Sequence, residues 1–245
     1  MNKLLIIVFC LRCFFLQAQK IETALVYTVH PADGSEKRPP LLLLLHGYGS
    51  NERDLFTFFK ALDSRFITVA VRAPNIMGNG AYNWFEFSTV NGVRTYDYQS
   101  AVKSRKLLLS FISKTCRELG ADSNRVFVLG FSQGAMLSYE LGMAAPSKIK
   151  GIVALSGSLM DETKKLITDA NQLKKLALFI AHGKSDQVIA LEEYRKVDLF
   201  FREKHMPKLT SVTYEMQHNI CGAELNDVKA WLTRTLNEKS ETLTK

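Results

Sequence analysis

Uninterrupted runs of apolar residues alternate along this chain with segments whose apolar residues recur every three or four positions. A run of about four to eight apolar residues between turn residues is typical of a strand that is covered on both faces of a sheet. The clearest run is Leu41–Leu45, five leucines that follow two prolines and lead into His46–Gly47. The pattern predicts strands at residues 24–29, 41–45, 67–71, 125–129, 152–155, 176–180 and 211–214.

The helical pattern occurs between these runs. It covers residues 102–116, 135–145, 191–201 and 225–236. Strands that alternate with helices predict an α/β fold, with a mostly parallel central sheet and helices on both faces. Because no linker rich in Pro, Gly or Ser interrupts the pattern, we expect a single domain over residues 20–240 without a separate cap domain. The connection 157–175 has room for a short helix, and residues 77–93 are expected to be the longest irregular stretch.

The first eighteen residues form a different kind of segment. A short positive start is followed by an apolar stretch over residues 4–16, interrupted by Arg12, and by the small residue Ala18. This order predicts a signal peptide at residues 1–18 and a protein that is exported, either periplasmic or secreted. An uncleaved anchor is the alternative. No later apolar run is long enough to span a membrane, so we expect no stable membrane span once the signal is removed.

Composition narrows the class further. The chain has 245 residues, of which 47% are hydrophobic and 23% are charged, which excludes a disordered tail and a collagen-like fibre. The net charge of +8 is spread over helix surfaces and loops without interleaved aromatics, so nucleic-acid binding is not expected. After signal cleavage two cysteines remain, Cys116 and Cys221. Two cysteines make no disulfide framework, and we expect free thiols, with their pairing left open.

One motif carries chemistry. Gly130–Phe131–Ser132–Gln133–Gly134 has the form G-x-S-x-G, directly after a predicted strand and directly before a predicted helix. A sharp turn in this context strains the serine backbone and lifts the hydroxyl above the sheet edge, and the flanking glycines leave the room that it needs. We therefore expect Ser132 to be a nucleophile.

A serine hydroxyl needs a base to take its proton. Ligand crevices of parallel sheets lie outside the carboxyl ends of the strands, which retains three of the five histidines: His46, His182 and His218. The chain order serine, acid, histidine selects His218, because only there does a loop acid fit in between. Asp186, shortly after the strand 176–180, is the expected acid.

Backbone N–H groups should stabilise the oxyanion of the reaction. Gln133, directly after the nucleophile, offers one such donor at the helix start. The second donor should come from the loop after Leu45, where Tyr48 lies between Gly47 and Gly49. We therefore predict the N–H groups of Tyr48 and Gln133 as the oxyanion site.

These motifs occur in a characteristic order, with Trp84–Phe85, Leu155–Ser156–Gly157 and His182–Gly183 between the parts already named. The set resembles the phospholipase/carboxylesterase branch of the α/β-hydrolase superfamily, which includes acyl-protein thioesterases. The resemblance covers about residues 38–236 and implies the same triad and oxyanion donors. It also implies that Trp84 and Phe85 line the acyl side. After the histidine the chain differs, because Asn219–Gly222 stands where relatives tend to start the last helix with a small hydroxyl residue or Pro.

The sequence therefore predicts a carboxylesterase or lysophospholipase-like serine hydrolase. Its expected substrate is a small-molecule ester, or a thioester, with a short to medium acyl chain, and no metal or organic cofactor is implied. An exopeptidase or amidase on the same triad is an alternative. A non-catalytic binding protein on a hydrolase fold is the alternative from another class, and the oligomeric state is left open.

Overall fold

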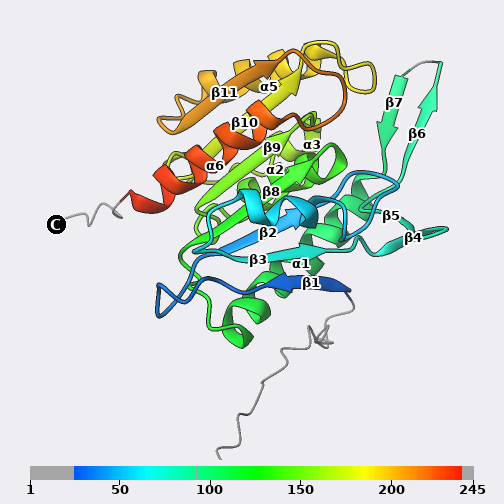
Figure 1. Cartoon of the computed structure of the whole chain (residues 1–245). Helices are drawn as coiled ribbons and strands as arrows, with labels where there is room; N and C mark the ends of the chain where they lie inside the picture. The colour runs from blue at the N-terminus through cyan, green and yellow to red at the C-terminus, as the bar shows by residue number, and fades with distance from the viewer. Residues whose placement is uncertain (1–24, 92, 239–245) are drawn as a thin grey trace, which may run out of the picture.

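A computed structural model describes residues 25–91 and 93–238 of the chain. The predicted signal peptide lies outside the described residues and stays a prediction. A seven-stranded sheet forms the centre, in the order β1-β3-β2-β8-β9-β10-β11 (Figure 1). Its strands are β1 (Tyr27–His30), β2 (Leu41–Leu45), β3 (Ile67–Val71), β8 (Val126–Phe131), β9 (Gly151–Leu155), β10 (Ala177–Gly183) and β11 (Leu209–Tyr214).

The sheet is parallel except for β1, which pairs antiparallel with β3 at one edge. All five residues of Leu41–Leu45 are buried, as expected for a central strand that is covered on both faces. Each predicted strand is present, and its ends move by at most a few residues. The mostly parallel sheet predicted from the sequence is thereby confirmed.

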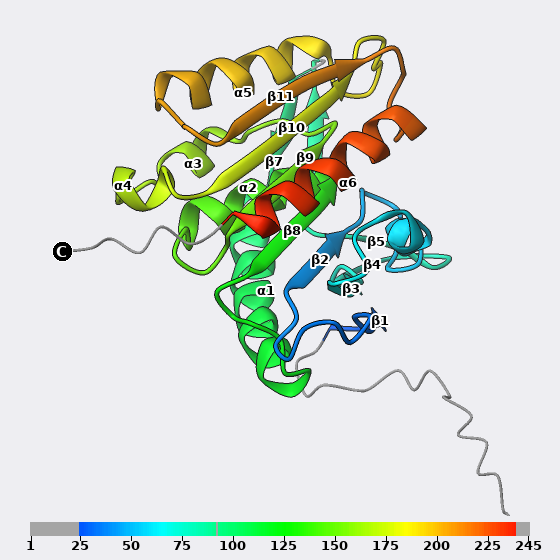
Figure 2. The ribbon, with the colours of Figure 1, turned by 60° about the vertical axis from the view of Figure 1, so that its left-hand side comes forward.

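Helices cover both faces of the sheet. They are the 3-10 helix η1 (Leu55–Ala61) and the α-helices α1 (Tyr98–Glu118), α2 (Gln133–Ala144), α3 (Asp161–Lys164), α4 (Ala170–Leu173), α5 (Leu191–Glu203) and α6 (Gly222–Asn237). Leu41, Leu43 and Leu45 share a core with α1, α2 and α5, whereas Leu42 and Leu44 share one with η1 and α6. Figure 2 shows α6 on one side of the sheet and α1 and α2 on the other. No helix within 25–91 and 93–238 combines the length and apolar character that a membrane crossing requires.

The expectation of an irregular stretch at residues 77–93 is wrong. Two antiparallel hairpins occupy the region, β4 (Asn75–Gly78) with β5 (Ala81–Asn83) and β6 (Phe87–Val90) with β7 (Val93–Tyr96). Asn79 and Asn91 both have φ of 51°, and each precedes a glycine in the sequence. Asn-Gly is a strong hairpin signal because both residues tolerate positive φ, so the sequence did contain the evidence. Hairpin β6–β7 stands beyond the carboxyl ends of the parallel strands (Figure 1).

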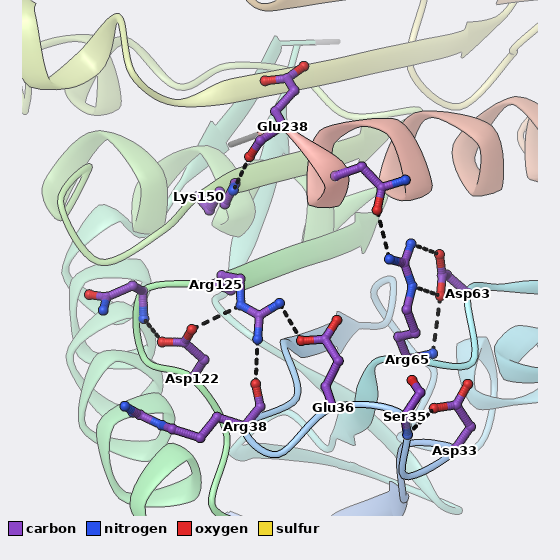
Figure 3. A network of polar contacts seen from close by, with 12 residues as sticks. Asp33, Ser35, Glu36, Arg38, Asp63, Arg65, Asp122, Arg125, Lys150 and Glu238 are labelled. Carbon is purple, nitrogen blue, oxygen red and sulfur yellow. Dashed lines mark hydrogen bonds and ion pairs between the residues drawn. The ribbon is translucent and has the colours of Figure 1, made fainter. Parts of the chain in front are cut away.

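A polar network joins the segments that precede β2, β3 and β8, at the amino ends of these strands (Figure 3). Arg125 forms ion pairs with Glu36 at 2.5 Å and with Asp122 at 2.9 Å. Arg65 forms an ion pair with Asp63 at 2.7 Å. The hydrogen bonds that the Arg65 side chain donates to the Asp63 carboxylate lower the pKa of Asp63 to about 2. Arg65 also donates to the side chain of Asn237 at the end of α6. Arg125 and Arg65 are therefore paired with carboxylates at this edge.

The turn from β8 to α2 is packed too closely for side chains. A Cβ at Gly134 would lie 2.0 Å from the carbonyl oxygen of Leu45, and one at Gly130 would lie 2.2 Å from that of Gly134. Both obstacles are backbone atoms, which cannot rotate away. Two glycines of the G-x-S-x-G motif are thus required for α2 to start directly against the end of β2.

We predict that Gly134→Ala destabilises the protein by about 3 kcal/mol, the upper end of the usual cost of overpacking, because the clash with backbone must push α2 away from β2. Chemical unfolding monitored by tryptophan fluorescence measures the change. Gly222→Ala is the matched control, since no atom lies within 4 Å of a Cβ at Gly222. Equal stability of the two variants would contradict the packing argument.

Candidate active site

Ser132 lies at the carboxyl end of β8, in a backbone conformation that only the surrounding structure can hold. Its φ of 54° and ψ of −116° fall outside the regions that non-glycine residues usually adopt. The backbone N–H of Ser132 donates to the carbonyl oxygen of Leu155 at 2.8 Å, which ties the turn to β9. The side chain makes no capping hydrogen bond to α2, so the hydroxyl is available to other partners.

Three side chains that are distant in the sequence meet at Ser132. The Nε2 atom of His218 lies 2.9 Å from the Ser132 Oγ, and its Nδ1 atom lies 2.7 Å from the Asp186 Oδ2. An ionised carboxylate only accepts hydrogen bonds, so Nδ1 carries the proton and Nε2 presents a lone pair to the hydroxyl. Such an arrangement can move a proton from the serine to the imidazole.

The carboxylate of Asp186 is held from two sides. Its Oδ1 atom accepts the backbone N–H groups of Val188 and Ile189 at 2.8 and 2.9 Å. Fully buried His182 places its Nε2 atom 2.8 Å from the carbonyl oxygen of Ile189 and 3.3 Å from the Asp186 Oδ2. His182, one of the three candidate bases, therefore contacts the acid rather than the serine.

The remaining histidines lie elsewhere. His46 is buried, accepts the N–H of Ala73 at Nε2 and contacts the carbonyl oxygen of Gly47 through Nδ1. Burial lowers the pKa of His46, which favours the neutral imidazole. His30 belongs to the edge strand β1, and His205 follows the end of α5 with φ of 52°. Of the five histidines, all within the described residues, only His218 has a hydrogen bond to Ser132.

The two predicted oxyanion donors flank the serine. Gln133 is the first residue of α2, so its N–H has no acceptor within the helix. A Cβ at Gly47 would lie 3.5 Å from the Ser132 Cβ, so the loop that carries Tyr48 runs beside the nucleophile. Gly49 donates to the carbonyl oxygen of Tyr82 at 2.9 Å, which fixes this loop against β5.

The side chain of Gln133 has a function that the sequence did not indicate. It accepts the N–H of Trp84 at 2.8 Å and donates to the carbonyl oxygen of Phe85 at 2.6 Å. The Trp84 indole in turn donates to the carbonyl oxygen of His46 at 2.8 Å. The Oε1 and Nε2 atoms of the Gln133 side-chain amide thus hold the Trp84–Phe85 backbone against the serine turn.

Of the two residues expected to line the acyl side, Trp84 and Phe85, only one lines the cavity at the serine. A cavity of about 180 Å³ lies over the serine, here called the Ser132 cavity. It is lined by Tyr48, Phe85, Phe87, Arg94, Tyr96, Ser132, Gln133, Met136, Val188, Ile189 and His218. Phe85 is one of these residues, but Trp84 is not. The prediction for Trp84 needs correction, because its fully buried indole is used for packing and for the bond to His46.

The start of α6 has a cysteine as its capping residue, where the resemblance led us to expect a small hydroxyl residue or Pro. Cys221 is the N-cap, and its Sγ accepts the N–H of Glu224 at 3.5 Å. A thiol thus takes the position of a capping hydroxyl. Both Cys221 and Cys116 are free in the structure.

The carboxylate of Glu224 is fully buried, and neither of its oxygens has a partner among the described residues. Burial raises the pKa of Glu224 to about 8. Glu224 is therefore expected to be protonated in the folded protein at neutral pH.

Within residues 25–91 and 93–238, no group of three or more His, Cys, Asp or Glu side chains could hold a metal ion. The sequence-based expectation of a reaction without metal stays a prediction.

Comparisons with known proteins agree with this architecture. The phospholipase/carboxylesterase family profile matches residues 29–236. Acyl-protein thioesterase 1 of Mycosarcoma maydis is 27% identical over 232 residues, which covers 85% of this chain and 95% of that protein. A carboxylesterase of Bacillus cereus superposes with a TM-score of 0.74 at 23% identity, covering 87% and 96% of the two chains. Acyl-protein thioesterase 2 of Zea mays superposes with a TM-score of 0.73 at 19% identity, covering 86% and 98%.

The fold and the family profile define a carboxylesterase-like serine hydrolase of the α/β-hydrolase superfamily. More narrowly, the chain belongs to the phospholipase/carboxylesterase family. The resemblance inferred from the sequence motifs is thereby confirmed.

We predict that the stability of the protein falls with rising pH because of Glu224. Its pKa of about 8 in the folded state exceeds its ordinary value of 4.5, so between these values only the folded state keeps the proton. The free energy of unfolding should fall by about 1.4 kcal/mol per pH unit across this window and level off above it. Glu224→Gln lacks this titrating group. The difference in free energy of unfolding between wild type and Glu224→Gln, measured by urea unfolding from pH 5 to 9, should therefore change with pH at the same rate.

Glu215→Gln is the control for that measurement, since the Glu215 side chain is 79% exposed. A constant difference between wild type and Glu224→Gln at all pH values would show that Glu224 ionises normally.

Proposed function

We propose that this protein hydrolyses carboxylic esters of short to medium acyl chains through an acyl-enzyme on Ser132. One observation carries the proposal: the continuous chain of hydrogen bonds from the Ser132 hydroxyl through His218 to Asp186. In this proposal Ser132 is the nucleophile, His218 is the general base and acid, and Asp186 orients the imidazole.

In the first half of the reaction, the Ser132 Oγ attacks the carbonyl carbon of the substrate while its proton passes to the His218 Nε2. The imidazolium that forms is stabilised by the Asp186 carboxylate, which is itself hydrogen-bonded by two backbone N–H groups. The carbonyl oxygen becomes negative and is bound by the N–H groups of Tyr48 and Gln133. Removal of one such donor typically costs about 3 kcal/mol of transition-state stabilisation.

His218 then returns the proton to the leaving group, and the bond between the carbonyl carbon and that group breaks. Water enters, gives a proton to His218 and attacks the acyl group, and Ser132 is released. The elements of water are thus divided between the free acid and the free alcohol. A thiol leaving group would follow the same steps, so a thioester substrate is included in the proposal.

The size of the Ser132 cavity favours a short acyl chain. Its volume of about 180 Å³ lies below the roughly 300–1,000 Å³ of a typical small-molecule pocket. Phe85, Phe87 and Met136 supply apolar contacts in its lining. An acyl chain of a few carbons fits this space, while longer chains would extend beyond it.

The two alternatives predicted from the sequence remain testable. The same triad can cut an amide, and relative rates on an acyl ester and the matching aminoacyl amide distinguish an esterase from an amidase. A non-catalytic binding protein would carry the fold without turnover. The hydrogen-bonded triad favours catalysis over binding alone.

We predict that Ser132→Ala and His218→Asn each lower the turnover of p-nitrophenyl butyrate by about 10⁴-fold or more, because the triad acts as a unit. His205→Asn is the matched control, since His205 lines neither the cavity at Ser132 nor the space beside it, and Asn tolerates its positive φ. Labelling by a fluorophosphonate probe should be lost in Ser132→Ala and retained in His205→Asn. Turnover within tenfold of wild type in folded Ser132→Ala would reject the proposed mechanism.

A further inference from the structure

The Ser132 cavity opens into a larger space. A groove of about 670 Å³, here called the side groove, is lined by Arg94, Thr95, Tyr96, Ser158, Leu159, Met160, Asp161, Glu162, Lys164, Val188, Ile189, Ala190, Glu193, Lys196 and Val197. Arg94, Tyr96, Val188 and Ile189 line both spaces. The side groove therefore adjoins the Ser132 cavity, between hairpin β6–β7, the segment around α3 and the start of α5.

The charges of the side groove are mostly paired with one another. Lys164 contacts Asp161 at 2.7 Å, and Lys196 contacts Glu193 at 2.5 Å. Glu162 lines only the side groove and not the Ser132 cavity. Arg94 is thus the cation at the junction of the two spaces.

The guanidinium of Arg94 is positioned by an aromatic ring and not by an ion pair with a carboxylate of the described residues. Its guanidinium lies over the Phe87 ring, 4.8 Å from the ring centroid, and Phe87 is itself part of the Ser132 cavity lining. Within the described part of the chain no Asp or Glu forms an ion pair with Arg94. Stacking on an aromatic face uses the plane of the guanidinium and leaves its N–H donors at the edge available.

We propose that Arg94 binds an anionic group, a carboxylate or a phosphate, on the substrate of Ser132. The inference rests on the function proposed above and adds a substrate class to it. The guanidinium fork suits both anions because two parallel N–H groups match two of their oxygens. Arg94 is then a specificity-determining residue, and the anion lies where the Ser132 cavity meets the side groove.

Two pairs of esters test this role and locate the anion. In the acyl pair, the 4-nitrophenyl monoester of glutarate is compared with 4-nitrophenyl pentanoate. In the leaving-group pair, 4-carboxyphenyl butyrate is compared with 4-carbamoylphenyl butyrate. For each pair the ratio of kcat/KM, anionic over neutral, is measured in wild type and variants, so that intrinsic differences in reactivity cancel.

In Arg94→Gln we expect this ratio to fall about tenfold in at least one pair, mainly through KM, which corresponds to the loss of one charge-assisted hydrogen bond. The pair that responds identifies whether the acyl part or the leaving group carries the anion. Arg94→Lys should retain part of the ratio, because it keeps the charge but not the fork. Since exposed charges are screened by salt, the wild-type ratio should also fall from low salt to about 0.5 M NaCl.

Lys196→Gln is the matched control, because it removes a cation of the same groove that is already paired with Glu193. Its ratio should equal that of wild type. Ratios in Arg94→Gln that match wild type in both pairs would overturn the proposal, and so would an equal fall in Lys196→Gln. Hydrolysis of the neutral esters, and its loss in Ser132→Ala, tests the proposed function separately.

Discussion

The first turn of α2 lies against the last residue of β2 at a separation that only glycine permits. The carbonyl oxygen of Leu45 occupies the space where a side chain of residue 134 would begin. This contact sets where α2 starts, and it thereby sets the backbone of Ser132 in its positive-φ conformation. Such strain persists only where the surroundings over-determine it. Here the surroundings are the bond from Ser132 to Leu155 and a helix that is buried along almost its whole length.

The rest of the site is assembled around that turn by polar contacts to backbone. Gln133, next to the serine, binds the backbone on both sides of the Trp84–Phe85 peptide. Trp84 binds the carbonyl oxygen of His46 in the loop that leads to Tyr48. Three segments that are far apart in the sequence are therefore fixed by two side chains, both of them buried. Because buried polar groups are costly to leave unpaired, these contacts hold the loops more firmly than apolar packing alone would.

Ion pairs occur at both ends of the parallel strands, and Arg94 differs from the cations that form them. At the amino ends, Arg125 and Arg65 are paired with carboxylates in one network (Figure 3). At the carboxyl ends, the Asp186 carboxylate is bonded to His218, and Arg94 is stacked on Phe87 with no carboxylate partner among the residues described. A paired charge stabilises the fold locally, whereas a charge without a protein partner can be satisfied by a ligand. This difference between Arg94 and the paired cations is the physical basis for the proposal that Arg94 recognises the substrate.

The sequence by itself determined the central sheet, the four long helices and the family, because these depend on local patterns. Leu41–Leu45 predicted a buried strand through its apolar run, and G-x-S-x-G predicted the sharp turn at Ser132 through its glycines. Only the tertiary structure decided that Phe85 lines the Ser132 cavity and Trp84 does not, although both are fully buried in the same core. It also decided that Lys196 pairs with Glu193, whereas Arg94 has no carboxylate partner among the described residues. Such outcomes depend on which distant side chains come within a few ångströms, and adjacent residues of similar chemistry carry no local signal that separates them.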